Sequence, residues 1–274
     1  CYIERSRSGF GNMMNPLYTF YLDDEAGGAR TLLYARKYGS AIKQNYLISL
    51  DKDDLSKNRS SRGGGYLGKL QSAKGSLEYT VYDSGVNPSD SGAEQARKEM
   101  CVIIYGKNKD GALANDRRME VAIPAIIATA DGSEHCVEWT PLRADKTDTM
   151  RHWFNRIRFK GAQNTLCRER MLCLHNRTWS VGRTSNLNDF MGRANQASVK
   201  NFQLVVSPPE DQYLLTKYEA TPLGTIDTND TANVLVQMGR MESGIFNVDF
   251  QYPVSPFSAF AICLTRFASK AVNE

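Results

Sequence analysis

The sequence lacks the long apolar runs, paired metal-ligand spacings and catalytic motifs that mark membrane, metal-binding and enzyme classes. No stretch of about 18 apolar residues occurs, so no membrane-spanning helix is expected. No signal peptide is recognisable at the start of the chain. None of the six cysteines forms a Cys-x-x-Cys pair. Glycine (21) and proline (9) are too few in 274 residues for a collagen-like or proline-rich chain.

The composition is that of an ordinary globular protein with a small basic excess. Hydrophobic residues make up 41% and charged residues 23%, enough to bury a full core. The net charge of +4 is too small to indicate nucleic-acid binding by itself. The basic excess gathers in residues 1–75 (12 Lys and Arg against 7 Asp and Glu) and 141–180 (9 against 3). Two such zones on one face would attract an anion, while the alternative is a solvated surface.

The cysteines indicate a reducing compartment. The chain is not a small, cysteine-dense scaffold, so we expect free thiols in a cytosolic or nuclear protein. Cys263 lies in an apolar run, where a buried thiol is common. The first residue is Cys rather than Met, so we expect a domain taken from a longer chain.

Short aromatic or β-branched segments separated by turn residues predict many strands. Turn signals such as Gly27-Gly28, Ser84-Gly85 and Asp131-Gly132 stand between them. Many strands with few long helices indicate a sandwich or a barrel. The predicted strands are residues 17–22, 31–35, 46–50, 79–82, 102–105, 119–123, 202–206, 234–238 and 246–250.

Two helices are predicted, and the second is the more informative. The first covers residues 148–157, with Asp148 as a candidate N-cap. The second covers residues 256–270, with Ser255 as N-cap and Pro256 at the first helical position. The second segment is apolar all round, so it is expected to be buried on every side. It is too short to cross a bilayer, which predicts a barrel wrapped around it. We expect one domain over residues 1–274, with inserted loops near 56–65 and 208–232.

Several motifs, in their order along the chain, resemble the Tubby C-terminal domain family. The resemblance covers nearly the whole chain, and the combined order is far more specific than any one motif. The matching segments are residues 45–49 (NYLIS), 66–70 (YLGKL), 79–83 (YTVYD), 85–88 (GVNP), 190–193 (FMGR), 198–203 (SVKNFQ), 238–240 (MGR), 246–253 (FNVDFQYP) and the apolar helix.

This resemblance implies a mainly β (α+β) fold: a closed antiparallel β-barrel of about twelve strands around a buried hydrophobic C-terminal helix. It also implies a non-enzymatic protein, without cofactor, that binds phosphatidylinositol 4,5-bisphosphate at the plasma membrane. Its domain would act as a membrane-tethering adaptor or regulator and as a monomer. Animal members carry membrane-protein cargo into cilia through a region outside this domain.

The resemblance places the lipid site on basic residues before the 45–49 segment and after the 66–70 segment. The predicted headgroup ligands are Arg36, Lys37, Lys43 and Lys69. Gln71 stands where the family has an arginine, which weakens the predicted site because bidentate cationic donors carry much of the affinity for phosphate. Lys69 lies two residues away on the same strand face and compensates in part. Arg59 and Arg62 are further candidates.

Other residues with possible chemistry are expected to be structural. Arg193 and Lys200 lie in framework motifs, where we expect them to pair with nearby backbone or carboxylate groups. His135-Cys136 and Cys173-x-His175 lack the spacing of zinc ligands, so no metal site is predicted. The alternative function is a nuclear regulator that binds DNA or protein and has a degenerate lipid pocket. The predicted location is the cytoplasm and plasma membrane, with the nucleus and the cilium as further compartments.

Overall fold

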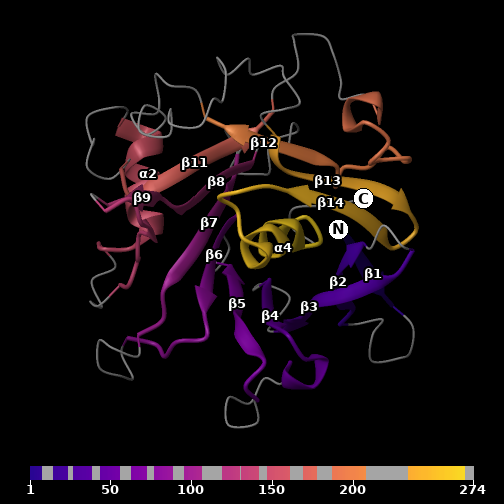
Figure 1. Ribbon diagram of the computed structural model, residues 1–274, viewed down its shortest axis with the longest axis horizontal. Coiled ribbons are helices and arrows are strands. Elements are labelled where there is room, and N and C mark those ends of the chain that lie inside the picture. Colours follow the sequence, from indigo (N-terminus) through magenta and orange to yellow (C-terminus); the bar gives the residue numbers. More distant parts are fainter. Residues whose placement is uncertain are drawn as a thin grey trace.

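Twelve strands close into one antiparallel barrel in the computed structural model of the chain (Figure 1). Closure leaves no strand edge unpaired. The structure describes residues 1–7, 15–23, 27–38, 44–55, 63–72, 77–88, 96–106, 119–129, 131–141, 147–160, 169–177, 187–207 and 234–268. The barrel strands are β1 (Tyr2–Ser6), β2 (Leu17–Asp23), β3 (Ala29–Tyr38), β4 (Asn45–Ser49), β5 (Tyr66–Ser72), β6 (Glu78–Asp83), β7 (Glu99–Tyr105), β8 (Met119–Pro124), β11 (Met171–Asn176), β12 (Phe202–Val206), β13 (Val234–Glu242) and β14 (Ile245–Phe250).

The strand order around the barrel follows the chain. Neighbours run β1–β2–β3–β4–β5–β6–β7–β8–β11–β12–β13–β14, and β14 returns to β1. A separate hairpin of β9 (Ile126–Ala128) and β10 (Glu134–Cys136) stands outside this sheet. Short 3-10 turns occupy η1 (Lys52–Asp54) and η5 (Leu187–Phe190). The predicted closed antiparallel barrel is confirmed.

Helix α4 (Pro256–Thr265) runs through the barrel interior, as the apolar pattern predicts (Figure 1). The Ser255 side chain accepts the backbone N–H of Ser258, which caps the helix. Every residue from 258 to 265 is buried. Inward-facing side chains of the strands complete one large core around them. The helix ends at Thr265 and a turn follows to 268, so it is shorter than the predicted 256–270; residues 269–270 lie outside the described residues.

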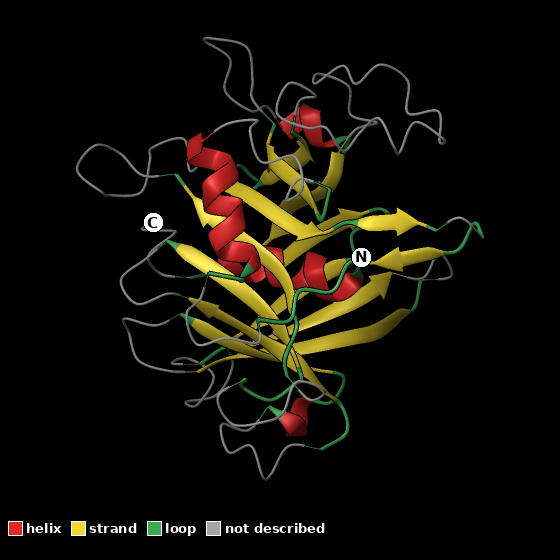
Figure 2. Ribbon diagram, turned by 90° about the vertical axis from the view of Figure 1, so that its left-hand side faces the viewer, coloured by secondary structure: helices red, strands yellow, loops and turns green. Residues whose placement is uncertain are grey.

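A second helix, α2 (Met150–Lys160), lies against the outside of the barrel, on the left in Figure 1 and toward the viewer in Figure 2. Its apolar side chains Met150, Phe154 and Ile157 pack on the outer surface of β7, β8 and β11 in a smaller core. The predicted helix began two residues earlier. Its cap is Thr149 rather than Asp148, because the Thr149 hydroxyl accepts the backbone N–H of His152.

The nine predicted strand segments overlap nine barrel strands, while β1, β5 and β11 are not among the predicted segments. β1 mixes polar and apolar residues over only five positions, and its pairing with both β2 and β14 is what holds it in the sheet. The predicted 208–232 loop and residues 56–62 of the other loop lie outside the described residues. Neither α2 nor α4, nor any shorter helix among the described residues, has the length and apolarity to cross a bilayer.

Candidate functional site

Four neighbouring strands bring two of the predicted basic residues onto one row of the outer face. Arg36 on β3 lies directly opposite Leu47 on β4, and Leu47 lies opposite Lys69 on β5. Lys69 in turn faces Tyr82 on β6. Ala35, next to Arg36, is fully buried, so Arg36 points away from the core. Strands are about 4.8 Å apart, which separates the backbones of Arg36 and Lys69 by about 10 Å.

Positive charge continues to the far end of this row. The guanidinium of Arg97 lies 4.1 Å from the centre of the Tyr82 ring, and the Lys69 ammonium lies 5.9 Å from it. Both distances fit cation–π contacts, which hold the two cations beside one another. Arg97 was not among the predicted ligands. The sequence gives no local signal for Arg97, since its place beside the row depends on tertiary contacts: its backbone N–H donates to the Val86 carbonyl, next to the Val86–Ala96 bridge.

The side chain of Arg36 is not committed to another described residue. It forms no salt bridge or hydrogen bond from its side chain to any described residue, and its Nε atom is buried without a partner. A buried guanidinium nitrogen without an acceptor is costly, so an anion at this place would lower the free energy of the site. Gln71 lies two residues beyond Lys69 on the same face of β5, opposite Thr80. The row together with Gln71 is called the outer basic row below.

The structure does not bring all predicted ligands to this row. Lys37 follows Arg36 on β3 and therefore points to the inner side of the barrel, directly opposite the fully buried Tyr46. Burial, followed by the positive charge of Arg5, lowers the pKa of Lys37. Lys43, Arg59 and Arg62 lie outside the described residues.

The second basic zone of the sequence is largely occupied by contacts within the protein. On α2, Arg158 pairs with Glu120 and Arg151 with Glu78. Arg156 lies over the Trp153 ring at 4.8 Å. Arg170 similarly lies over the Trp139 ring at 4.4 Å. The two ion pairs fasten α2 to the barrel.

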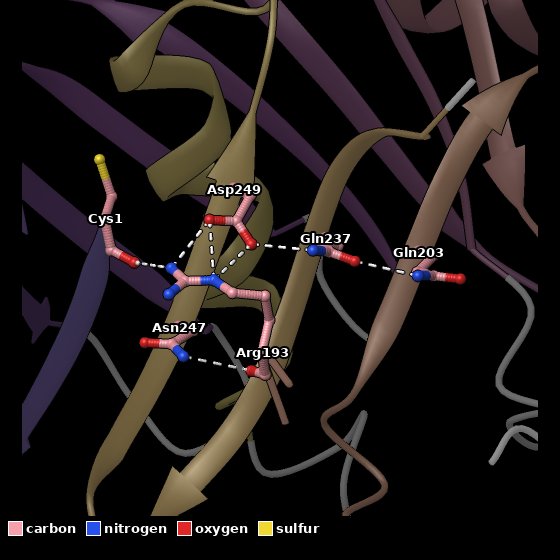
Figure 3. Close-up of polar contacts among 6 residues, drawn as sticks. All are labelled: Cys1, Arg193, Gln203, Gln237, Asn247 and Asp249. Atoms are coloured by element: carbon pink, nitrogen blue, oxygen red, sulfur yellow. Dashed lines mark hydrogen bonds and ion pairs between the residues drawn. The ribbon is translucent and has the colours of Figure 1, made fainter. Parts of the chain in front are cut away.

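Arg193 has the structural role expected of it (Figure 3). Its Nε and Nη2 atoms donate to the Asp249 carboxylate at 2.8–3.2 Å, and Nη2 also donates to the carbonyl of Cys1. The Asp249 carboxylate accepts a further bond from Gln237, whose amide oxygen accepts one from Gln203. This ladder ties β1, β12, β13 and β14 together. A cavity of 190 Å³ beside it includes Asp249 in its lining, which does not suit an anionic ligand.

The two cysteine–histidine pairs of the sequence lie on the β9–β10 hairpin and on β11. Within the described ranges, no three His, Cys, Asp or Glu side chains gather in a metal-binding arrangement. His135 and Cys136 are exposed on the β9–β10 hairpin, where the imidazole contacts the Ser133 hydroxyl at 2.9 Å. The Nδ1 atom of His175 lies 3.3 Å from the Ser207 hydroxyl.

The chain is similar to known proteins over nearly its whole length. Residues 1–269 match the Tub family. Mouse Tubby-related protein 2 is 33% identical, over 98% of this chain and 42% of the relative. Human Tubby-related protein 3 is 31% identical, over 100% of this chain and 54% of the relative. Protein king tubby 1 of Aedes aegypti is 31% identical, over 100% and 57%. The chain thus spans about half the length of the curated relatives it matches.

Proposed function

The chain belongs to the Tub family, and on that basis we propose that it is a non-enzymatic module that binds phosphatidylinositol 4,5-bisphosphate and tethers to membranes carrying it. The observation that carries the proposal is the outer basic row. Arg36 stands there with a buried Nε and no acceptor, on the same face as Lys69.

The two cations of the row suit a doubly phosphorylated ring for different reasons. The guanidinium of Arg36 can donate two parallel hydrogen bonds to one phosphate, whereas the Lys69 ammonium acts as a point charge. The Tyr82 ring beside Lys69 restricts where that ammonium lies. A second phosphate would meet Lys69 while the first meets Arg36, and the intervening Leu47 is buried and competes for neither. Anionic lipids nearby add a general attraction that salt screens.

Replacing Arg36 by Ala is expected to weaken binding to the bisphosphorylated lipid about tenfold, the loss of one charged hydrogen-bonded group. Co-sedimentation with liposomes containing phosphatidylinositol 4,5-bisphosphate measures the change. Arg30→Ala is the matched control, because Arg30 is an exposed arginine at the other end of β3. If both variants weakened lipid binding equally, the loss would come from net charge alone, and Arg36 would not be a headgroup ligand.

Replacing Gln71 by Arg is expected to tighten binding to the same lipid by about 1–3 kcal/mol at low salt, because a charged fork replaces a neutral amide beside the row. The gain should be much smaller on phosphatidylserine membranes of equal charge, since these offer no phosphate pair. Gln196→Arg adds the same charge at an exposed position away from the row and serves as control. No gain on either membrane would mean that residue 71 does not face the ligand.

The proposed setting is the cytoplasmic side of the plasma membrane, with the nucleus and the cilium as further locations. Binding would be reversible, because it depends on a lipid that can be hydrolysed. Carriage of membrane-protein cargo would require a region outside this chain. Binding to DNA is the competing function, and a titration with duplex DNA at several salt concentrations, run beside the liposome panel, tests it. It would appear as affinity for duplex DNA with a steep salt dependence and no preference among lipids.

A further inference from the structure

The inner side of one barrel mouth gathers cations from three strands. Arg5 on β1 lies opposite Tyr18, and Lys37 on β3 lies opposite Tyr46. Arg240 on β13 lies opposite Phe246. These three aromatic partners are 0–3% exposed and belong to the interior core. Residues directly opposite on paired strands share a face, so all three cations are directed to the inner side.

Contacts with the end of α4 place these cations at the same mouth. The Arg5 guanidinium lies 5.7 Å from the Phe267 ring and 5.9 Å from the Tyr18 ring. Phe246, the partner of Arg240, packs edge-on against Phe267 with ring centres 4.9 Å apart. The Tyr46 ring, opposite Lys37, meets Tyr18 at 5.7 Å. The mouth that holds the carboxyl end of α4 is therefore the mouth that collects the cations.

A further arginine adds to this charge from the helix itself. Arg266 follows α4, is 1% exposed and lies between the rings of Tyr105 and Phe202, at 5.4 and 5.0 Å. The partial negative charge at a helix carboxyl end accounts for a cation in the position of Arg266 and, in part, for Arg5 beside Phe267. It does not account for Lys37 and Arg240, which belong to strands of the barrel wall.

No carboxylate of the described strands faces these cations at this mouth. The acidic residues of the described strands at this end lie on the outer face. Glu4 accepts a bond from Tyr21, Glu78 and Glu120 pair with arginines of α2, and Glu242 lies opposite Ile245, whose neighbour Phe246 faces the core. The side chains of Lys37 and Arg240 form no hydrogen bond or ion pair with any described residue. The Nε atoms of Arg5 and Arg240 are buried and lack acceptors.

We propose that this mouth is a second anion site, which binds a phosphate-type oxyanion through Arg5, Lys37 and Arg240. An oxyanion supplies the acceptors that the guanidinium groups lack, and it offsets the repulsion among like charges in a half-buried place. Arg266, buried at the carboxyl end of α4, adds its positive charge. The buried hydroxyl of Tyr46 lies beside that of Tyr18 and is a further donor for the anion. The site is separate from the outer basic row, because Arg36 and Lys37 point to opposite sides of one strand.

Thermal unfolding in inorganic phosphate, with ionic strength held constant by sodium chloride, tests the proposal. Phosphate is expected to raise the melting temperature of the unaltered chain. Lys37→Met should weaken the apparent phosphate affinity about tenfold, as loss of one charged ligand does. Lys52→Met removes an exposed lysine of η1, outside both sites, and is the matched control that should keep the effect. A phosphate effect that is absent from the unaltered chain, or that is as strong in Lys37→Met as in Lys52→Met, would overturn the proposal.

A direct measurement follows Lys37 itself, so the result does not depend on whether an Arg5 variant folds. Lysines are reductively methylated with ¹³C, and the Lys37 signal, identified by its absence from Lys37→Met, is titrated with pH. Inorganic phosphate should raise the pKa of Lys37, because a bound anion favours its charged form. A further upward shift on vesicles containing phosphatidylinositol 4,5-bisphosphate would assign a lipid headgroup as ligand, while a shift with free phosphate alone would assign a soluble anion. A Lys37 signal that responds to neither probe contradicts the site and leaves the outer basic row untouched.

Discussion

Leu264→Asp is expected to abolish the fold. Leu264 is fully buried in α4, with core side chains on every side, and the helix carries no charged residue within its bounds. An unpaired carboxylate there costs about 4–5 kcal/mol or more, which is comparable with the whole stability of a typical domain. Circular dichroism should show no cooperative melting transition for the purified variant.

Two substitutions keep this test specific. Leu50→Asp makes the same chemical change at a leucine that is 55% exposed, and it should melt close to the unaltered chain. Leu264→Met keeps the volume and apolarity and should cost less than about 1.5 kcal/mol. A soluble Leu264→Asp variant that melts cooperatively would contradict the burial of α4 inside the barrel.

The stability of the chain is expected to fall between about pH 4.5 and pH 7 because of Glu99. This side chain is 1% exposed on β7, and its carboxylate accepts the backbone N–H of Met150 at 2.5 Å, at the start of α2. Burial is the largest influence and raises the pKa of Glu99 to about 7, although the Met150 N–H and two arginines act in the opposite direction.

The direction of this pH dependence follows from the number of protons bound by the folded and the unfolded chain. Between an unfolded pKa of 4.5 and a folded pKa of about 7, the folded chain holds a proton that the unfolded chain has released. Raising the pH through this window therefore costs stability, by about 3 kcal/mol at about 1.4 kcal/mol per pH unit. Above pH 7 this contribution is lost, and below pH 4.5 it is fully present.

Denaturant unfolding of the unaltered chain and of Glu99→Gln at several pH values separates Glu99 from other titrating groups. The variant should gain stability relative to the unaltered chain as the pH rises from 5 to 8. Glu120→Gln, which removes a carboxylate paired with Arg158 of the same helix, controls for the loss of one charge beside α2. Parallel pH profiles for Glu99→Gln and the unaltered chain would contradict a titrating Glu99.

Leu264 and Glu99 show which features a local sequence pattern can predict and which it cannot. The apolar segment after Ser255-Pro256 identifies a buried helix because its consecutive apolar residues cover every side of a helix. Glu99 carries no such signal. It caps a helix 51 residues further along the chain, and only the packing of α2 on β7 brings the two together.

The candidate site shows the same division. The motifs identified the strands that carry it and the basic residues before and after them. They grouped Arg36 with Lys37, which the alternation of a strand separates onto opposite faces. Arg97 entered the outer basic row, and Arg5 and Arg240 gathered with Lys37 at the mouth, through strand pairing between distant segments.

The sequence by itself therefore determined the elements of this protein: short alternating strands, a capped apolar helix, and a surplus of basic residues in two zones. The tertiary structure alone decided which of those basic residues meet one another, which turn outward, and which are already paired with carboxylates. The physical reason is that a side chain's period along a strand is local, whereas its register against a neighbouring strand is set by closure of the whole barrel around α4.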